Sequence, residues 1–423
     1  MKKEKELFKK IIGYDEVKKT LGRVIDCINN QDKYKKLGCN IPHGLLFYGE
    51  PGLGKSTLAE EFIRECPNRK SFIIRKIKSN GSFIDYINKV FNNAINESPS
   101  IVLLDDLDKF AEDDDNDNKE EYVAVQSLID EARDKDVFVI ATANNKGVLP
   151  ISLLRSGRFD IQIKIDYPSE KDSYKIAEYY LKKKKVDKNI NFKNIVCVFS
   201  GESCASIEKA CNQAGIYAGY NNKEQIEWDE LLRAALELRF DCSMEDLYKE
   251  DKYGLNTAYH EAGHTLIAEL LEPKSIAFTT IANTDSSTRG VTVFHDNEYY
   301  WDDIDFMKKR VKAKLAGKAA TEIVFNKCDT GANSDLHGVY NIVERFIDNY
   351  CMNNFNSWIR HGYEVSEKVK ESKDDEINSL INDYYNEVKE LLFNNRNKLD
   401  ELAKKLYEKK ILFEDEIQNI IHK

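Results

Sequence analysis

Two histidines four residues apart, with a glutamate beside the first, give this chain its clearest capacity for chemistry. The segment Thr257-Ala-Tyr-His260-Glu261-Ala-Gly-His264 contains the spacing HExxH, in a stretch with helical periodicity. On a helix both imidazoles project from one face, so they can bind one metal ion. Glu261 is then placed to take a proton from a water molecule at that ion. The spacing predicts metal-assisted amide hydrolysis, and the alternative is a structural histidine pair.

A glycine-rich segment nearer the start of the chain has the spacing of a phosphate-binding loop. It follows the apolar run 44–48 and precedes a stretch with helical spacing, which is the context that GxxxxGK[ST] requires. The backbone N–H groups of such a loop surround phosphate oxygens, and the following helix presents its positive end to them. Lys55 is expected to reach the β- and γ-phosphates of ATP, and Ser56 to ligate Mg²⁺. The matching residues are Gly49, Glu50, Pro51, Gly52, Leu53, Gly54, Lys55 and Ser56.

Two acids end another apolar run, 101–104, roughly fifty residues after that loop. Asp105 is expected to hold Mg²⁺ through water, and Asp106 to orient the water that attacks the γ-phosphate. The alternative is a strand that ends in two solvated acids. The distance from Lys55 favours the nucleotide site.

The runs 44–48, 72–77, 101–104, 137–142 and 161–165 are short, apolar and rich in Val, Ile and Phe, and helical stretches lie between them. Strands that alternate with helices predict an α/β fold with a parallel sheet covered on both faces. After residue 168 helical patterns dominate, apart from a predicted strand at 290–294 and a polar stretch at 241–254. We predict three parts: 1–167, 168–245 and 246–423.

Composition narrows the class of protein. The chain has 423 residues, a formal net charge of -10 and nine cysteines without a CxxC pair. The negative charge argues against a general nucleic-acid binder, and the cysteine pattern favours a reducing compartment. No apolar stretch reaches the ~20 residues that a membrane helix needs. We therefore expect a soluble, cytoplasmic protein.

The segment IATANNKGVLPISLLRSGRFD (140–160) resembles the sensor strand and second region of homology of AAA ATPases, most specifically those of the FtsH family of ATP-dependent zinc proteases. The resemblance implies that Asn144 contacts the γ-phosphate or its attacking water. It implies that Arg155 and Arg158 are arginine fingers, which complete the site of a neighbouring subunit. A ring is then expected, by analogy a homo-hexamer.

The resemblance extends to the metal site and covers nearly the whole chain. DTGANSDLHG (329–338) looks like the family segment that carries the third zinc ligand, which falls on Asp335. Glu322, in AGKAATEIVF, is the rival ligand. The resemblance thus implies a large α/β AAA subdomain and a small helical one, followed by a mostly α-helical zinc metallopeptidase domain with one Zn²⁺ per subunit.

Four departures from the family pattern have consequences. No transmembrane segment precedes the ATPase here, so membrane contact is expected only through a partner. Asp106 stands where the family has glutamate, which predicts slower ATP hydrolysis. Lys78-Ser-Asn-Gly81 lacks the aromatic residue of the family's pore loop, which predicts a weak grip on substrate. The segment 199–211 resembles the small subdomain near the nucleotide with an insertion, and no ligand is assigned there.

These features predict an ATP-dependent zinc metalloendopeptidase that acts on protein or peptide substrates. One alternative is an ATP-gated assembly or regulatory AAA module with weak or no proteolysis. Another is a zinc peptidase for small or unfolded peptides, in which ATP only holds the ring together.

Overall fold

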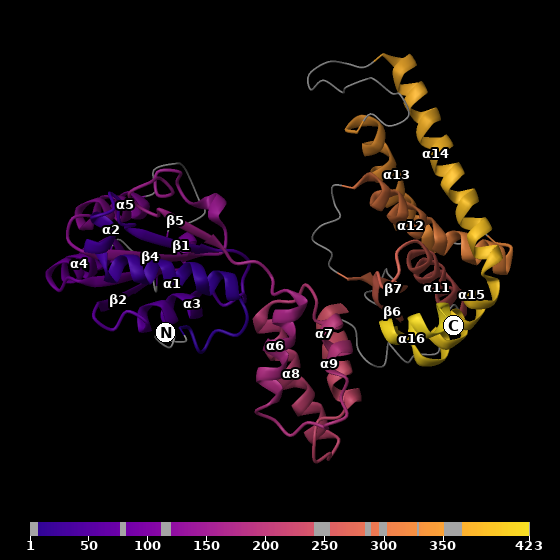
Figure 1. Cartoon of the computed structure of the whole chain (residues 1–423), viewed down its shortest axis with the longest axis horizontal. Helices are drawn as coiled ribbons and strands as arrows, with labels where there is room; N and C mark the ends of the chain where they lie inside the picture. The colour runs from indigo at the N-terminus through magenta and orange to yellow at the C-terminus, as the bar shows by residue number, and fades with distance from the viewer. Residues whose placement is uncertain are drawn as a thin grey trace. The chain divides into compact units, whose positions relative to one another are not determined.

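The computed structural model describes residues 7–76, 82–110, 120–240, 254–283, 289–295, 303–327, 330–350 and 366–422 (Figure 1). The chain divides into two compact units, each of which is described by itself. The first consists of Met1–Val186 with Phe199–Ile226, and the second of Asp187–Val198 with Glu227–Lys423. The helical stretch 168–245 thus contributes to both units, and the boundaries at 167 and 245 stay a prediction.

The first unit is built on a parallel five-stranded sheet of order β2-β3-β4-β1-β5. Its core strands β3 and β4 are buried along their whole length. Successive side chains of a strand point to opposite faces, so both faces of this sheet need an apolar cover. The predicted α/β class is confirmed. The strands are β1 (Gly44–Tyr48), β2 (Lys70–Arg75), β3 (Ser100–Asp105), β4 (Val137–Ala143) and β5 (Ile161–Lys164).

Helices cover both faces of this sheet. Ile101 and Leu103 pack with residues of α1 and α3, whereas Val102 and Leu104 pack with residues of α4 and α5. This alternation explains why β3 reads as a continuous apolar run. The helices of this unit are α1 (Asp15–Asn29), α2 (Gln31–Lys35), α3 (Lys55–Arg64), α4 (Ser82–Asn96), η1 (Leu107–Lys109), α5 (Glu120–Ala132), η2 (Lys146–Val148), α6 (Glu170–Leu181) and α8 (Cys204–Tyr220).

The second unit is mostly helical and carries a small antiparallel sheet of order β7-β6-β8. The predicted strand at 290–294 is β7 (Arg289–Phe294), and its neighbours are β6 (Ile276–Asn283) and β8 (Ile411–Phe413). The chain ends in the helices α14, α15 and α16. The helices are α7 (Phe192–Val198), α9 (Trp228–Phe240), α11 (Gly254–Leu271), α12 (Ile304–Phe325), η3 (Thr330–Ala332), α13 (Asn333–Asp348), α14 (Glu367–Asn394), α15 (Arg396–Lys409) and α16 (Glu414–Ile421).

Small residues let α11 and α12 pack very closely in the core of this unit. A Cβ atom at Gly263 on α11 would lie 2.5 Å from the carbonyl oxygen of Ala316 and 2.7 Å from Cβ of Ala320, both on α12. Side chains any larger would separate the two helices. The close approach brings one face of α12 against the helix that carries the two histidines.

Among the described residues, no helix is both long enough and apolar enough to cross a membrane. The pore-loop stretch 78–81 and most of the polar segments 112–121 and 241–254 lie outside the described residues.

Candidate metal centre and nucleotide site

The structure brings the two histidines of α11 together with an aspartate from α13. His260 Nε2 and His264 Nε2 lie 3.0 Å apart, and Asp335 Oδ2 lies 3.3 Å from the first and 3.2 Å from the second. One ligand atom from each of these three side chains lies within 4.8 Å of the other two. Two imidazoles and one carboxylate are a donor set of catalytic zinc sites, so the residues fit a zinc ion.

Neighbouring backbone orients this cluster. His264 Nδ1 lies 2.7 Å from the carbonyl oxygen of Ala313 on α12, and an N–H at Nδ1 can donate to that oxygen. This bond leaves Nε2 of His264 as the electron-pair donor toward the centre of the cluster. Gly317, one turn further along α12, leaves room there. A Cβ atom at this position would lie 2.5 Å from His264 Nε2 and 2.6 Å from His260 Nε2.

The charges in the cluster favour an ionised carboxylate. Burial alone would raise the pKa of Asp335, but hydrogen bonds from His260 and His264 hold that pKa far below its usual value. Burial opposes a charge on His264, yet the contact with Asp335 raises the pKa of this imidazole. Lys314 Nζ lies 3.5 Å from the second carboxylate oxygen, Oδ1 of Asp335. The cluster therefore presents a fixed anionic ligand beside two imidazoles.

Glu261 lies beside the cluster and is held by β7. It is 4 % exposed, and its Oε2 accepts a hydrogen bond of 2.7 Å from the hydroxyl of Thr292. Burial raises the pKa of the Glu261 carboxyl, although the nearby imidazoles oppose that rise. Gly290, with φ +77°, lets β7 approach, because a Cβ atom there would lie 2.8 Å from Glu261 Cγ. The arrangement fixes one carboxylate oxygen and leaves the other to exchange a proton.

Glu322, the rival third ligand, belongs to a different network. Its carboxylate accepts hydrogen bonds from Lys389 (2.7 Å), Lys318 (3.1 Å) and the hydroxyl of Tyr385. These donors, of which Lys389 has the largest effect, lower the pKa of Glu322 to about 2. These side chains balance the negative charge of Glu322. The side chains that could hold a metal ion together are His260, His264 and Asp335.

The metal cluster and Glu261 line a cleft of about 920 Å³ in the second unit. Four consecutive residues of β7, residues 289–292, form part of its wall. In the described sheet β7 pairs with β6 on one side only. The cleft therefore contains the His260–His264–Asp335 cluster and an edge strand whose backbone N–H and C=O groups on one side are not paired within the described sheet.

The nucleotide-site residues also converge, in the first unit. Gly52 and Gly54 adopt positive φ of 79° and 86°, so the loop turns sharply into α3, which begins at Lys55. Lys55 Nζ donates to the carbonyl oxygens of Gly49 (2.8 Å) and Glu50 (2.7 Å). Burial lowers the pKa of Lys55. The acids around it, of which Asp106 has the largest effect, oppose that decrease. The loop and its lysine have the form that a polyphosphate site needs.

Asp105 contacts the loop through Ser56. Its Oδ1 accepts hydrogen bonds from Ser56 (2.8 Å) and Thr142 (2.7 Å), and its Oδ2 accepts one of 2.8 Å from Arg75. Burial opposes ionisation, but these hydrogen bonds lower the pKa of Asp105. Ser56 and Asp105, the two residues predicted to serve Mg²⁺, are thus in direct contact.

Asp106 has an unusual backbone and an intramolecular ion pair. Its φ is 57°, and its carboxylate lies 2.7 Å from Lys109 Nζ. The same bond raises the pKa of Lys109. The carboxylate of Asp106 thus contacts the last residue of η1, and the slower ATP hydrolysis stays a prediction.

We expect Asp106→Glu to raise steady-state ATP turnover by roughly several-fold, because one more methylene carries the carboxylate nearer to the attacking water. Phosphate release at saturating ATP measures this rate. Asp134→Glu is the matched control, because Asp134 is an exposed residue just after α5. An unchanged or lower rate in Asp106→Glu would count against this role.

The three residues predicted to sense or complete the γ-phosphate site differ in environment. Asn144 follows β4, and its backbone N–H donates to Asp108 Oδ2 at 2.9 Å. Arg158 Nη2 lies 2.7 Å from Asp130 Oδ2, and Arg158 Nη1 donates to the carbonyl oxygen of Ser152. Arg155 is exposed. Arg158 is therefore held within its own unit, whereas Arg155 is accessible to another molecule.

Several residues of both sites were not predicted from the sequence. Arg75, Thr142 and Asp108 contact nucleotide-site residues, and Gly317 and Thr292 contact the metal site. Each belongs to another element than the motif it serves, and none has a spacing that reveals it. Only the sequence position of Arg75 and Thr142 at strand ends hints at a role, since parallel strands end at one edge of the sheet.

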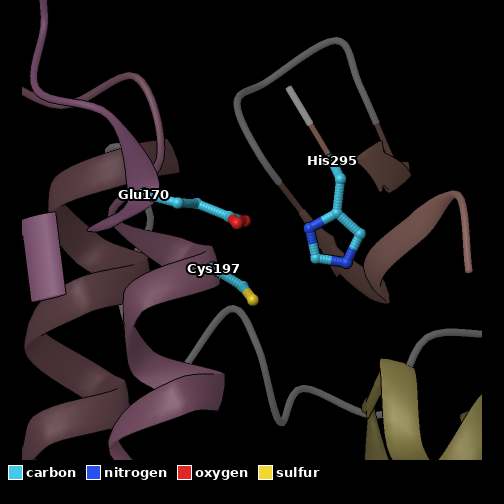
Figure 2. A group of neighbouring side chains, drawn as sticks. All are labelled: Glu170, Cys197 and His295. Carbon is cyan, nitrogen blue, oxygen red and sulfur yellow. The ribbon is translucent and has the colours of Figure 1, made fainter. Parts of the chain in front are cut away.

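Figure 2 draws three further side chains of types that can ligate a metal, Glu170, Cys197 and His295. Glu170 begins α6 in the first unit, whereas Cys197 on α7 and His295 after β7 belong to the second. Because each unit is described by itself, we assign no metal site to these residues. Within the second unit, His295 Nε2 lies 3.5 Å from a carboxylate oxygen of Glu414, at the start of α16.

Comparisons with known proteins relate this chain to two families. Residues 248–420 match the model of peptidase family M41, and residues 45–167 match that of the ATPase family associated with various cellular activities (AAA). "ATP-dependent zinc metalloprotease FtsH 2" of Thermoanaerobacter sp. (strain X514) is 29% identical over 98% of this chain and 82% of its own length. Proteins named "ATP-dependent zinc metalloprotease FtsH" are similar too: that of Karelsulcia muelleri is 29% identical over 98% of this chain and 70% of its length. That of Bacillus subtilis is 25% identical over 99% of this chain and 70% of its length.

Proposed function

We propose that this chain, which belongs to the FtsH-like family of AAA ATPases joined to M41 peptidases, is an ATP-dependent zinc metalloendopeptidase that hydrolyses protein substrates. One observation carries the proposal. His260, His264 and Asp335 offer ligand atoms within 4.8 Å of one another, at a cleft that Glu261 also lines.

At the metal centre, the two imidazoles and the carboxylate of Asp335 would hold the zinc ion. Zinc, when bound, polarises the scissile carbonyl and makes water a stronger acid and nucleophile. Glu261 accepts the proton of the attacking water and returns it to the leaving amine. Thr292 keeps the carboxylate of Glu261 in place through its bond to Oε2.

Strand β7 would position the substrate. An extended peptide can add to the free side of an edge strand and form backbone hydrogen bonds with it. Such bonds do not depend on the substrate's side chains, so they suit an endopeptidase that acts on many sequences. Thr292, which bonds Glu261, lies on this same strand, so a peptide paired with β7 passes close to the proposed base.

The first unit would supply ATP binding and hydrolysis. The loop 49–56 holds the phosphates, Ser56 and Asp105 hold Mg²⁺, and Asn144 contacts the γ-phosphate or its attacking water. AAA proteases act on protein substrates and assemble as rings. We propose a homo-hexamer in the cytoplasm, in which Arg155 and Arg158 are the arginine fingers that reach the nucleotide of the neighbouring subunit.

The second candidate function is an ATP-gated assembly or regulatory module with weak proteolysis. The observation that favours it is the ion pair of 2.7 Å between Asp106 and Lys109, because Lys109 competes with an attacking water for this shorter carboxylate. A ring that binds ATP and hydrolyses it slowly would act as a switch on a partner.

Degradation assays separate these functions. An unfolded protein and a folded, tagged protein would each be incubated with the full chain and either ATP or a slowly hydrolysed analogue. We expect ATP-dependent loss of both substrates, and no loss with Glu261→Gln. Cleavage of the unfolded chain alone, independent of hydrolysis, would identify a simple peptidase. Bound zinc with no cleavage of either substrate would contradict the proposal and favour the regulatory module.

A further inference from the structure

An arginine on α12 reaches into the peptidase cleft without an acidic partner among the described residues. Arg310 lines the same cleft as His260 and Glu261. Its guanidinium carbon lies 3.4 Å from the centre of the Phe294 ring, so the two planes form a cation–π contact. Burial lowers the pKa of Arg310 to about 10. The guanidinium therefore carries a partly desolvated charge that has an aromatic support.

The other charged residues of the cleft that come from α12 and α13 are already paired. Lys314, one turn after Arg310, lies 3.5 Å from Asp335. Asp335 in turn contacts both histidines of the metal cluster. Among the described residues, Arg310 forms no ion pair with Asp335 or with another acid. A planar, always charged guanidinium of this kind binds carboxylates well, with two parallel hydrogen bonds.

The positions of Arg310 and Phe294 relate this charge to the scissile bond. Residues 310, 313, 314 and 317 follow the i, i+3, i+4, i+7 spacing of one helix face, and Gly317 lies against the two imidazoles. Seven residues along a helix place Arg310 about 10 Å from that point. On β7, Phe294 comes two residues after Thr292, which bonds Glu261. Two residues of extended chain span about 7 Å.

We propose that Arg310, supported by Phe294, is a specificity residue that binds a carboxylate of the substrate within three residues of the scissile bond. The proposal rests on the peptidase function proposed above and defines its substrate class: peptides with an aspartate or glutamate at that position. A free C-terminal carboxylate has the same chemistry, so the experiment must distinguish the two.

Internally quenched peptides test the proposal on the full chain with ATP. Both ends are blocked, and one residue at each of three positions on either side of the cleaved bond is Glu, Gln or Lys. At one position the wild type should cleave the Glu peptide with a kcat/KM about tenfold above that of the Gln peptide. Arg310→Gln should bring this ratio near one. Arg310→Glu should reverse the preference, in favour of Lys.

Lys308→Gln is the matched control, because it removes a positive charge from the same helix at a residue paired with Asp305 outside the cleft. It should leave activity and the Glu-to-Gln ratio unchanged. A peptide with a free C-terminus and no acidic side chain forms the second arm. Cleavage of this peptide near its end, lost in Arg310→Gln, would identify the terminal carboxylate as the ligand.

Binding separates the failure of this proposal from failure of the peptidase function. Fluorescent Glu and Gln peptides would be titrated into Glu261→Gln and into the double variant with Arg310→Gln. A Glu preference in the first that is absent in the second supports the subsite, even if no peptide is cleaved. Cleavage or binding with equal preference for Glu and Gln overturns the subsite and leaves the peptidase function standing. If no peptide is bound and none is cleaved, both the subsite and the peptidase function are overturned.

Discussion

Glu261→Gln is expected to lower the rate of peptide hydrolysis by about 10²- to 10⁴-fold, the usual contribution of a general base. The amide keeps the size of the side chain and can still accept a hydrogen bond from Thr292, but it cannot accept a proton at neutral pH. Zinc content and ATP turnover should stay at the wild-type level, because the three proposed ligands and the whole nucleotide site are unchanged.

Glu272→Gln provides the matched control for this variant. Glu272 directly follows α11 and pairs with Lys309 outside the cleft, so the same chemical change there should leave hydrolysis unaffected. Initial rates on a quenched peptide measure both variants. Glu261→Gln with more than a tenth of the wild-type rate would show that another group takes the proton.

Gly317→Ala is expected to weaken zinc binding by about 10- to 100-fold or more, which is the range for changes beside the ligands of a metal. The new Cβ atom would lie 2.5 Å from His264 Nε2 and 2.6 Å from His260 Nε2. Cβ atoms in proteins essentially never lie under 3.0 Å from such an atom. The imidazoles must move from the positions in which they converge on Asp335. Peptidase activity should fall with the zinc, whereas ATP binding in the other unit should not change.

Helix stability cannot explain such a loss, because alanine is the better helix former by about 1 kcal/mol. Gly219→Ala on α8 is the control, since nothing lies within 4 Å of the Cβ atom that it adds. It should stabilise the chain and leave zinc binding unchanged. Zinc retained during competition with a chelator measures both variants. Gly317→Ala with wild-type retention would contradict the geometry of the metal centre.

Local patterns in the sequence predict much of this structure. The run 101–104 is apolar on both faces and becomes the fully buried β3, because helices cover both sides of its sheet. Glycines at 52 and 54 mark a loop that turns through positive φ into α3. HExxH falls on α11, where a spacing of four residues alone determines that His260 and His264 face one another.

Contacts between distant elements could not be predicted in the same way. Nothing near Glu261 indicates that Thr292, 31 residues later, bonds its carboxylate. Strand β8 was missed because it has only three residues and pairs with β6, more than a hundred residues away. Strand β6 was missed as well. Gly317 looks like an ordinary helical glycine until the packing of α12 on α11 places it against two imidazoles.

Charge partners were equally hidden from the sequence. The motifs predict that Asp105 and Ser56 both serve Mg²⁺, but nothing in the sequence indicates that Arg75 contacts Asp105 or that Tyr385 and Lys389 contact Glu322. Arg75 lies on β2, and Tyr385 and Lys389 lie on α14, whereas Lys318 lies one turn before Glu322 on the same helix, α12. The resemblance to a known family pointed to Asp335 as a ligand, and only the three-dimensional structure supplies the competing network around Glu322.

Zinc content per chain, measured by elemental analysis of the purified full-length protein and two variants, tests the central claim most directly. We expect about one zinc per chain in the wild type and in Glu322→Gln, because Glu322 is bound by Lys318, Tyr385 and Lys389. Asp335→Asn should lose most of its zinc, since an amide replaces the anionic ligand. Substoichiometric zinc in the wild type, or zinc that is lost from Glu322→Gln and kept by Asp335→Asn, would contradict the account.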